Sequence, residues 1–144
     1  MEELVQAAKI VLANHYAFYV KAQNYHWNVT GPDFSQYHKL LGDIYEEVGN
    51  SIDTLAEEIR AMNAYAPGSF SRFAELSSIE DEVNIPNAFD MLRKLLMDID
   101  IVQQSIMQAY HLAEQNMQHG YSNLMAERQD AFNKHAWMLK ATLR

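Results

Sequence analysis

The sequence predicts an all-α protein, a four-helix bundle in which one long crossover joins the second and third helices. Apolar residues recur at alternating steps of three and four along most of the chain, which is the period of amphipathic helices. No stretch shows the alternation typical of a β-strand. Glycine and proline clusters divide the chain into four long helical stretches. With 144 residues and 49% hydrophobic content, we expect one domain covering residues 1–144.

The first predicted helix runs from about Leu4 to the break at Thr30-Gly31-Pro32. Its apolar stripe consists of Leu4, Ala8, Val11, His15, Phe18, Ala22 and Tyr25. Glycine and proline interrupt the helix at the break, and Asp33 can cap the helix that follows. Because His15 lies in the apolar stripe, we expect a buried, hydrogen-bonded side chain there rather than a metal ligand.

The second predicted helix begins at about Phe34, is roughly thirty residues long and ends at Ala66-Pro67-Gly68-Ser69. Its apolar stripe consists of Phe34, Tyr37, Leu41, Ile44, Val48, Ile52, Leu55, Ile59 and Met62. A plain solvent strip on another side consists of Lys39, Asp43, Glu47, Asn50, Thr54 and Glu58. The crossover of roughly twenty residues after this helix is expected to contain one short helix around Phe73.

The third predicted helix opens at Pro86 and closes at Gly120. Its stripe consists of Phe89, Leu92, Leu96, Ile99, Val102, Ile106, Tyr110, Ala113 and Met117. A fourth helix is expected from about Ser122. The side chains that it is expected to turn toward the core are Leu124, Ala131, His135 and Met138. Two long helices, a long crossover and two further helices are the connectivity of ferritin-like bundles.

Composition narrows the possible functions. Eleven basic and nineteen acidic residues give a net charge of -8, which repels nucleic acid and attracts cations. Because cysteine is absent, any metal site must use histidine and carboxylates. No glycine-rich phosphate loop or serine nucleophile motif occurs, which disfavours nucleotide-driven and acyl-transfer chemistry. Without a signal peptide or a membrane span, we expect a cytoplasmic protein with no membrane partner.

A third strip of the second helix mixes small residues with metal-ligand types. It holds His38, Gly42, Gly49, Asp53, Ala56 and Glu57. A glycine inside a helix costs about 1 kcal/mol relative to alanine, so we expect the two glycines to allow another helix to come close. Asp53 and Glu57 lie one turn apart and can share one cation.

His38 cannot join that cation within one chain, because fifteen residues separate it from Asp53, about 22 Å of helix. Two antiparallel copies of the helix, crossing at a two-fold axis near Glu46 or Glu47, would bring His38 of each copy to Asp53 and Glu57 of the other. The pattern therefore predicts two identical sites in a dimer.

His26 lies twelve residues before His38, across the predicted turn, and is expected to fold back beside it. Two imidazoles and two carboxylates would then converge. Such a ligand set without sulfur suits Fe(II), Zn(II) or Mn(II), and it is suited to iron redox chemistry.

The run His26-Trp27-Asn28-Val29-Thr30-Gly31, followed by Phe34, His38, Asp53, Ala56 and Glu57, resembles the Dps family of mini-ferritins over nearly the whole chain. The later run from His135 to Leu139 is similar to the family's fourth helix. The resemblance implies a cage of twelve copies, with two-fold interfaces through the second helix. It also implies a ferroxidase that oxidises Fe(II) with hydrogen peroxide or dioxygen and stores ferric mineral inside.

The resemblance further assigns the iron ligands. His26 and His38 would come from one subunit, and Asp53 and Glu57 from its partner. Trp27 resembles the family's tryptophan beside the site, which supplies an electron or quenches a radical. The alternative is that Trp27 is an aromatic residue packed in the bundle.

Two departures from the family pattern leave alternatives open. The family usually has an aspartate four residues after the second histidine, where this chain has Gly42, so we expect a second iron to bind weakly through His38 and water. A lysine-rich tail is absent, so we expect DNA protection through removal of iron and peroxide rather than through direct DNA binding. The alternatives are a ferroxidase-impaired shell with a structural or DNA-protective role, and a cage that carries zinc.

Overall fold

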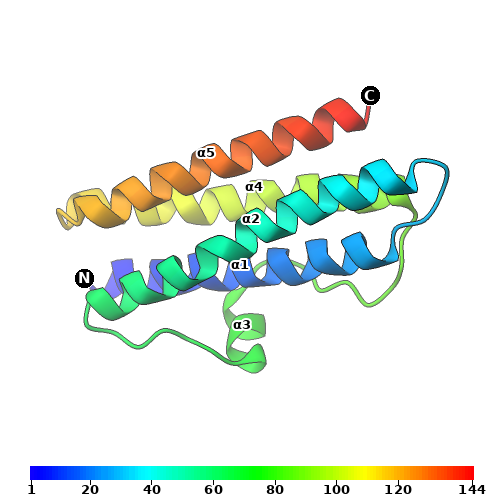
Figure 1. Cartoon of the computed structure of the whole chain (residues 1–144). Coiled ribbons are helices and arrows are strands. Elements are labelled where there is room, and N and C mark those ends of the chain that lie inside the picture. The colour runs from blue at the N-terminus through cyan, green and yellow to red at the C-terminus, as the bar shows by residue number, and fades with distance from the viewer.

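A computed structural model describes residues 1–144, and its secondary structure is entirely helical. The helices are α1 Glu2–Asn28, α2 Phe34–Ala61, α3 Phe70–Leu76, α4 Ala88–Gln115 and α5 His119–Thr142. The four long helices form a bundle, while α3 lies outside it, beside α1 on the α2–α4 crossover (Figure 1). The predicted fold class and the short helix around Phe73 are confirmed. None of the helices combines the length and apolarity needed to cross a bilayer.

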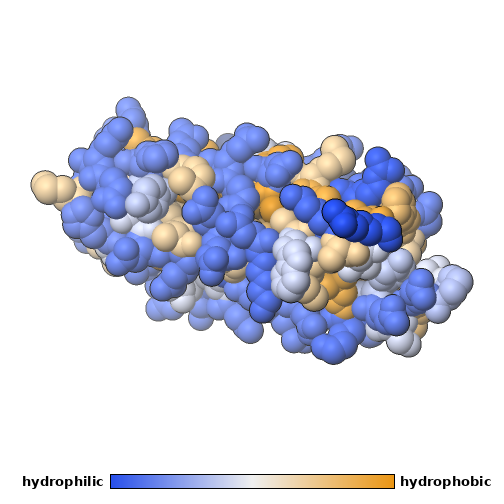
Figure 2. Space-filling view, turned by 90° about the horizontal axis from the view of Figure 1, so that it is seen from above, coloured by the Kyte–Doolittle hydropathy of each residue, from blue (hydrophilic) through white to orange (hydrophobic).

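The core is formed by the apolar faces of the four long helices. Every residue of the predicted stripe on α1 is buried. The predicted stripes of α2 and α4 are buried along their middles, but their outer members Phe34, Phe89 and Met117 are 41%, 49% and 77% exposed. These three side chains lie at or beyond helix ends, where the bundle no longer covers them. The face of the molecule on which α5 lies is largely hydrophilic, with scattered apolar patches (Figure 2).

The helix ends near the crossover differ from the prediction. α2 ends at Ala61, before Ala66-Pro67-Gly68-Ser69, because Asn63 adopts a left-handed φ of 66° and Ala64 N–H donates to the Ile59 carbonyl at 3.2 Å. α4 begins at Ala88, two residues after Pro86. Its cap is Asn87, whose side-chain oxygen accepts a hydrogen bond from the N–H of Asp90 at 2.9 Å.

The remaining boundaries are set by backbone conformation as well. α4 ends at Gln115, because Met117 adopts a left-handed φ of 55°. α5 then begins at His119, so Gly120 lies in its first turn and does not close the preceding helix. Asp33 occupies the N-cap position of α2 as predicted, but its side chain makes no capping hydrogen bond.

The inward face of α5 is rotated relative to the prediction. Leu124 and Ala131 are only half-buried and Met138 is exposed, whereas His135 is buried as predicted. The buried side chains of α5 are Tyr121, Ser122, Met125, Arg128, Phe132, His135 and Leu139. Because the charged Arg128 lies in the middle of this face, it interrupts the apolar periodicity by which the sequence would indicate the inward side.

Arg128 is the centre of a polar cluster inside the bundle. Its guanidinium donates two hydrogen bonds to the carboxylate of Glu47, and its Nε donates to His15 Nε2 at 3.1 Å. His135 Nε2 donates to Glu47 Oε1 at 2.7 Å. Glu47 therefore faces α5, and its assignment to a plain solvent strip is wrong. The expectation that His15 is buried and hydrogen-bonded is confirmed, and so is the inward position expected of His135.

The cluster shifts the pKa values of two members. Burial, reinforced by the Arg128 charge, lowers the pKa of His15 to about 3, and its Nδ1–H donates to the Val11 carbonyl at 2.8 Å. Burial alone would raise the pKa of Glu47, but hydrogen bonds from His135 and Arg128 outweigh that effect and lower it to about 2. The cluster therefore combines a neutral imidazole with an ionised carboxylate.

The low pKa of His15 predicts a loss of stability in acid. Between its ordinary value of 6.5 and about 3, the unfolded chain binds a proton at this residue that the folded chain does not. The free energy of unfolding contributed by His15 should fall by about 2–3 kcal/mol between pH 6 and pH 4. Denaturant unfolding at each pH should show a shallower decline for His15→Gln, while exposed His111→Gln follows the wild type. Parallel profiles for all three proteins would contradict this prediction.

Candidate metal centre

His26 and His38 form a stacked pair where α1 meets α2. His26 lies in the last turn of α1 and His38 in the first turns of α2, joined by a tight turn in which Gly31 has φ 121°. The ring centroids are 3.8 Å apart with an interplanar angle of 15°. The turn thus brings together two imidazoles that are twelve residues apart, as the sequence predicts.

Reciprocal hydrogen bonds fix the orientation of both rings. His26 Nδ1 lies 2.6 Å from the carbonyl oxygen of His38, and His38 Nδ1 lies 2.7 Å from that of His26. Because a carbonyl only accepts, each Nδ1 carries the proton, and each neutral ring keeps its lone pair on Nε2. A backbone carbonyl that holds Nδ1–H in this way is the usual support of a histidine metal ligand. The pair is therefore prepared for metal binding through Nε2.

The two glycines of α2 make room for side chains of α1 in the same chain. A Cβ added to Gly42 would lie 2.8 Å from His26 Cε1, and one added to Gly49 would lie 2.7 Å from Tyr19 Cε1. The predicted close approach thus exists, but side chains of α1 occupy the space beside both glycines. The expectation that another helix comes close to the two glycines is confirmed, and that helix is α1 of the same chain.

Asp53 and Glu57 lie exposed on α2, away from the histidine pair. No group of three or more histidine, aspartate or glutamate side chains within the chain is placed to hold a metal ion. This agrees with the separation of about 22 Å along the helix. Trp27 is 64% exposed, so it is not packed inside the bundle of this chain. One chain therefore presents the two histidines and the two carboxylates at different places.

Comparison with known proteins connects this arrangement to a family. The sequence profile of the ferritin-like domain matches residues 6–144. The chain belongs to the ferritin-like family. Its relatives include DNA protection during starvation proteins and its structural neighbours include Dps proteins, so the resemblance to the Dps family inferred from the sequence is confirmed.

Three ferritin-like proteins illustrate the similarity. General stress protein 20U of Bacillus subtilis is 30% identical over 99% of this chain and 98% of its own length. The DNA protection during starvation protein of Brevibacillus brevis is 29% identical over 92% of this chain and 89% of its own length. The crystal structure of the Dps protein from Vibrio cholerae O1 has a TM-score of 0.94 and 29% identity. The match covers 99% of this chain and 90% of the Vibrio cholerae chain, and that protein is described as a member of a superfamily of ferritin-like diiron-carboxylate proteins.

Gly42 has a role in this Dps-type chain that its sequence position does not reveal. The residue provides no carboxylate, but its missing side chain gives His26 the space to stack on His38. The sequence also gives no reason to select Tyr45, whose ring centroid lies 5.1 Å from that of His26. Its position seven residues after His38 and three after Gly42 is the only signal that could have indicated it.

Replacing Gly42 should displace His26. In Gly42→Ala the new methyl group would overlap the imidazole, which is held by its hydrogen bond to His38, so the ring must leave its stacked position. We expect at least about tenfold weaker metal binding, the scale for loss of a supporting contact. Isothermal titration calorimetry with Co(II) as the metal measures the affinity. Gly68→Ala, where a Cβ meets nothing within 4 Å, is the control; equal affinities in both variants would contradict the role of Gly42.

Proposed function

We propose that this protein is a ferroxidase that oxidises Fe(II) with hydrogen peroxide, or with dioxygen, at sites shared by two subunits, and stores the ferric product inside a cage of twelve copies. The supporting observation is the stacked histidine pair, with both Nδ1 atoms bonded to carbonyls and both Nε2 atoms free. The exposed carboxylates of a second copy supply the ligands that one chain lacks.

The geometry of α2 supports a shared site. Asp53 and Glu57 lie about as far beyond the middle of the helix as His38 lies before it. Two copies of α2 that cross antiparallel near Glu46 would place each histidine pair beside the carboxylates of the partner subunit. Large exposed apolar side chains such as Phe70 (82%) and Val83 (82%) are further support for self-association.

The ligand types support iron as the substrate. His26 with Asp53 and Glu57 from the other subunit provides one nitrogen and two carboxylates, a set that suits Fe(II). His38 offers a single nitrogen to a second Fe(II), and Gly42 adds no oxygen ligand. We therefore assign a tight iron position and a weak one to each interface. Zinc accepts the same ligands but cannot be oxidised there.

Charge supports a role in iron uptake more than direct DNA binding. Twelve chains with a charge of -8 each would together carry a formal charge of -96. This charge attracts Fe(II) and repels the phosphate backbone of DNA. DNA protection by this protein would then follow from the removal of iron and peroxide.

The test measures the formation of ferric iron by its ultraviolet absorbance. The protein is first loaded anaerobically with Fe(II) and then given a pulse of peroxide. We expect rapid oxidation by the wild type and its loss in Asp53→Ala/Glu57→Ala. The control is Asp43→Ala/Asp100→Ala, which removes two exposed carboxylates elsewhere on α2 and α4. Equal, slow traces for all three proteins would favour the ferroxidase-impaired shell. Bound zinc without ferric product, in protein purified without added metal, would favour a zinc cage.

A further inference from the structure

A row of aromatic rings leads away from His26 between α1 and α2. The ring centroid of Tyr45 lies 5.1 Å from that of His26, and Tyr19 lies 5.7 Å from Tyr45. Tyr16 follows at 5.9 Å from Tyr19. The three tyrosines form an unbroken series of ring contacts between the histidine pair and the middle of α1.

Two glycines of α2 accommodate this row. Gly42, Tyr45 and Gly49 follow one another at helical steps of three and four and share one face. Gly42 accommodates the ring of His26, and Gly49 accommodates the ring of Tyr19. Because glycine is less favourable than alanine inside a helix, the two glycines lower the stability of α2 while making room for the row.

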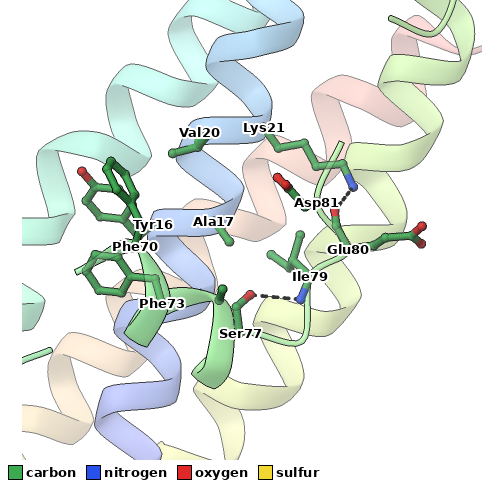
Figure 3. A pocket seen from close by; sticks show the side chains of 11 residues that line it. Tyr16, Ala17, Val20, Lys21, Phe70, Phe73, Ser77, Ile79, Glu80 and Asp81 are labelled. Carbon is green, nitrogen blue, oxygen red and sulfur yellow. Dashed lines mark hydrogen bonds between the residues drawn. The ribbon is translucent and has the colours of Figure 1, made fainter. Parts of the chain in front are cut away.

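The far end of the row lies at the edge of a cavity. Tyr16 stacks on Phe73 of α3, with ring centroids 4.5 Å apart and an interplanar angle of 14°. Figure 3 shows Tyr16 with Phe70 and Phe73 on one side of a cavity of about 260 Å³ between α1 and the crossover. Tyr16 is ten residues before His26, about 15 Å along α1. The row therefore connects the iron site with a distant part of the subunit.

The proposed iron site gives the row a purpose. Hydrogen peroxide accepts two electrons, whereas one Fe(II) donates only one. Because Gly42 supplies no carboxylate for a second iron, peroxide meets a single Fe(II) in many encounters. We propose that Tyr45, Tyr19 and Tyr16 form a redox relay that donates the second electron, an inference that rests on the proposed ferroxidase function.

The relay balances in atoms and electrons. Fe(II), H₂O₂ and the phenol of Tyr45 give Fe(III), hydroxide, water and the phenoxyl radical of Tyr45. The O–O bond breaks, Fe(II) and Tyr45 are each oxidised by one electron, and the phenol proton ends in the water formed. Tyr45 then regains an electron and a proton from Tyr19, and Tyr19 regains them from Tyr16. The radical finishes on Tyr16, away from the iron-binding imidazoles.

Spin trapping with mass spectrometry tests the relay on the assembled protein. Protein with one Fe(II) per site receives peroxide, and ferric absorbance is recorded in parallel. We expect the wild-type adduct on Tyr16. Tyr19→Phe preserves the ring but resists oxidation, so the adduct should move to Tyr45. Tyr45→Phe should remove adducts from both Tyr19 and Tyr16, whereas Tyr65→Phe, an exposed tyrosine outside the row, should leave the Tyr16 adduct unchanged.

Several results would overturn the relay. A Tyr16 adduct that persists in both Tyr19→Phe and Tyr45→Phe would show that the radical reaches Tyr16 by another route. Loss of that adduct in Trp27→Phe would make the tryptophan the electron donor. Ferric product without any tyrosine adduct rejects the relay but keeps the proposed function, whereas no ferric product in the wild type rejects both.

Discussion

Mixing two inactive variants is expected to restore about a quarter of the wild-type rate of Fe(II) oxidation, because a shared site takes its halves from different chains. One variant is His26→Ala/His38→Ala, which keeps the carboxylates, and the other is Asp53→Ala/Glu57→Ala, which keeps the histidines. Random pairing makes half of the dimers mixed, and each mixed dimer contains one complete site and one empty site. The measurement is peroxide-driven ferric formation after the chains are unfolded and refolded together.

The controls separate assembly from chemistry. Each variant refolded alone should stay inactive, and mixing the separately folded proteins without unfolding should restore nothing. Light scattering on the mixture checks that cages form. A mixture that assembles normally but stays inactive would show that the four residues do not share a site between two chains.

Arg128→Met is expected to lower the free energy of unfolding strongly. The guanidinium is nearly buried, and its removal leaves the Glu47 carboxylate and His15 Nε2 without their donor. Breaking a buried ion pair on one side typically costs 3–5 kcal/mol. Because the side chain of Glu47 is 39% exposed and can reach water, we expect about 3 kcal/mol, the lower end of that range. Denaturant unfolding at neutral pH measures the change.

A double variant separates the charge effect from the loss of packing. Arg128→Met/Glu47→Met removes both charges, so it should lose less stability than Arg128→Met alone. Arg93→Met, at an exposed position of α4, should change the free energy of unfolding little. If the double variant is no more stable than the single one, the loss comes from packing rather than from the unpaired carboxylate.

Features with local causes could be predicted from the sequence. The apolar period gives the four long helices, and the turn after α1 brings His26 beside His38, because their positions depend only on nearby residues. The helix ends were less predictable. Asn63 and Met117 adopt left-handed conformations that are uncommon for residues other than glycine, so no glycine or proline marks these ends.

Features that depend on a distant partner could not be predicted. Arg128 looks solvent-facing in the sequence, because only the packed bundle places Glu47 of α2 and His15 of α1 against it. Gly42 and Gly49 show that something comes close, but not that it is a ring from α1. The carboxylate half of the site remains a prediction, since Asp53 and Glu57 need a second chain.

The guanidinium of Arg128 also has a consequence for where a metal can bind. Ferritin-like di-iron proteins hold their metals in the interior of the bundle, between carboxylates and histidines of facing helices. In this chain the corresponding ligand types, His15, Glu47 and His135, surround a permanent organic cation instead. A fixed positive charge in a poorly hydrated interior repels Fe(II) and occupies its ligands. The interior of each chain is thereby insulated from iron, which agrees with the proposal that oxidation takes place between two chains.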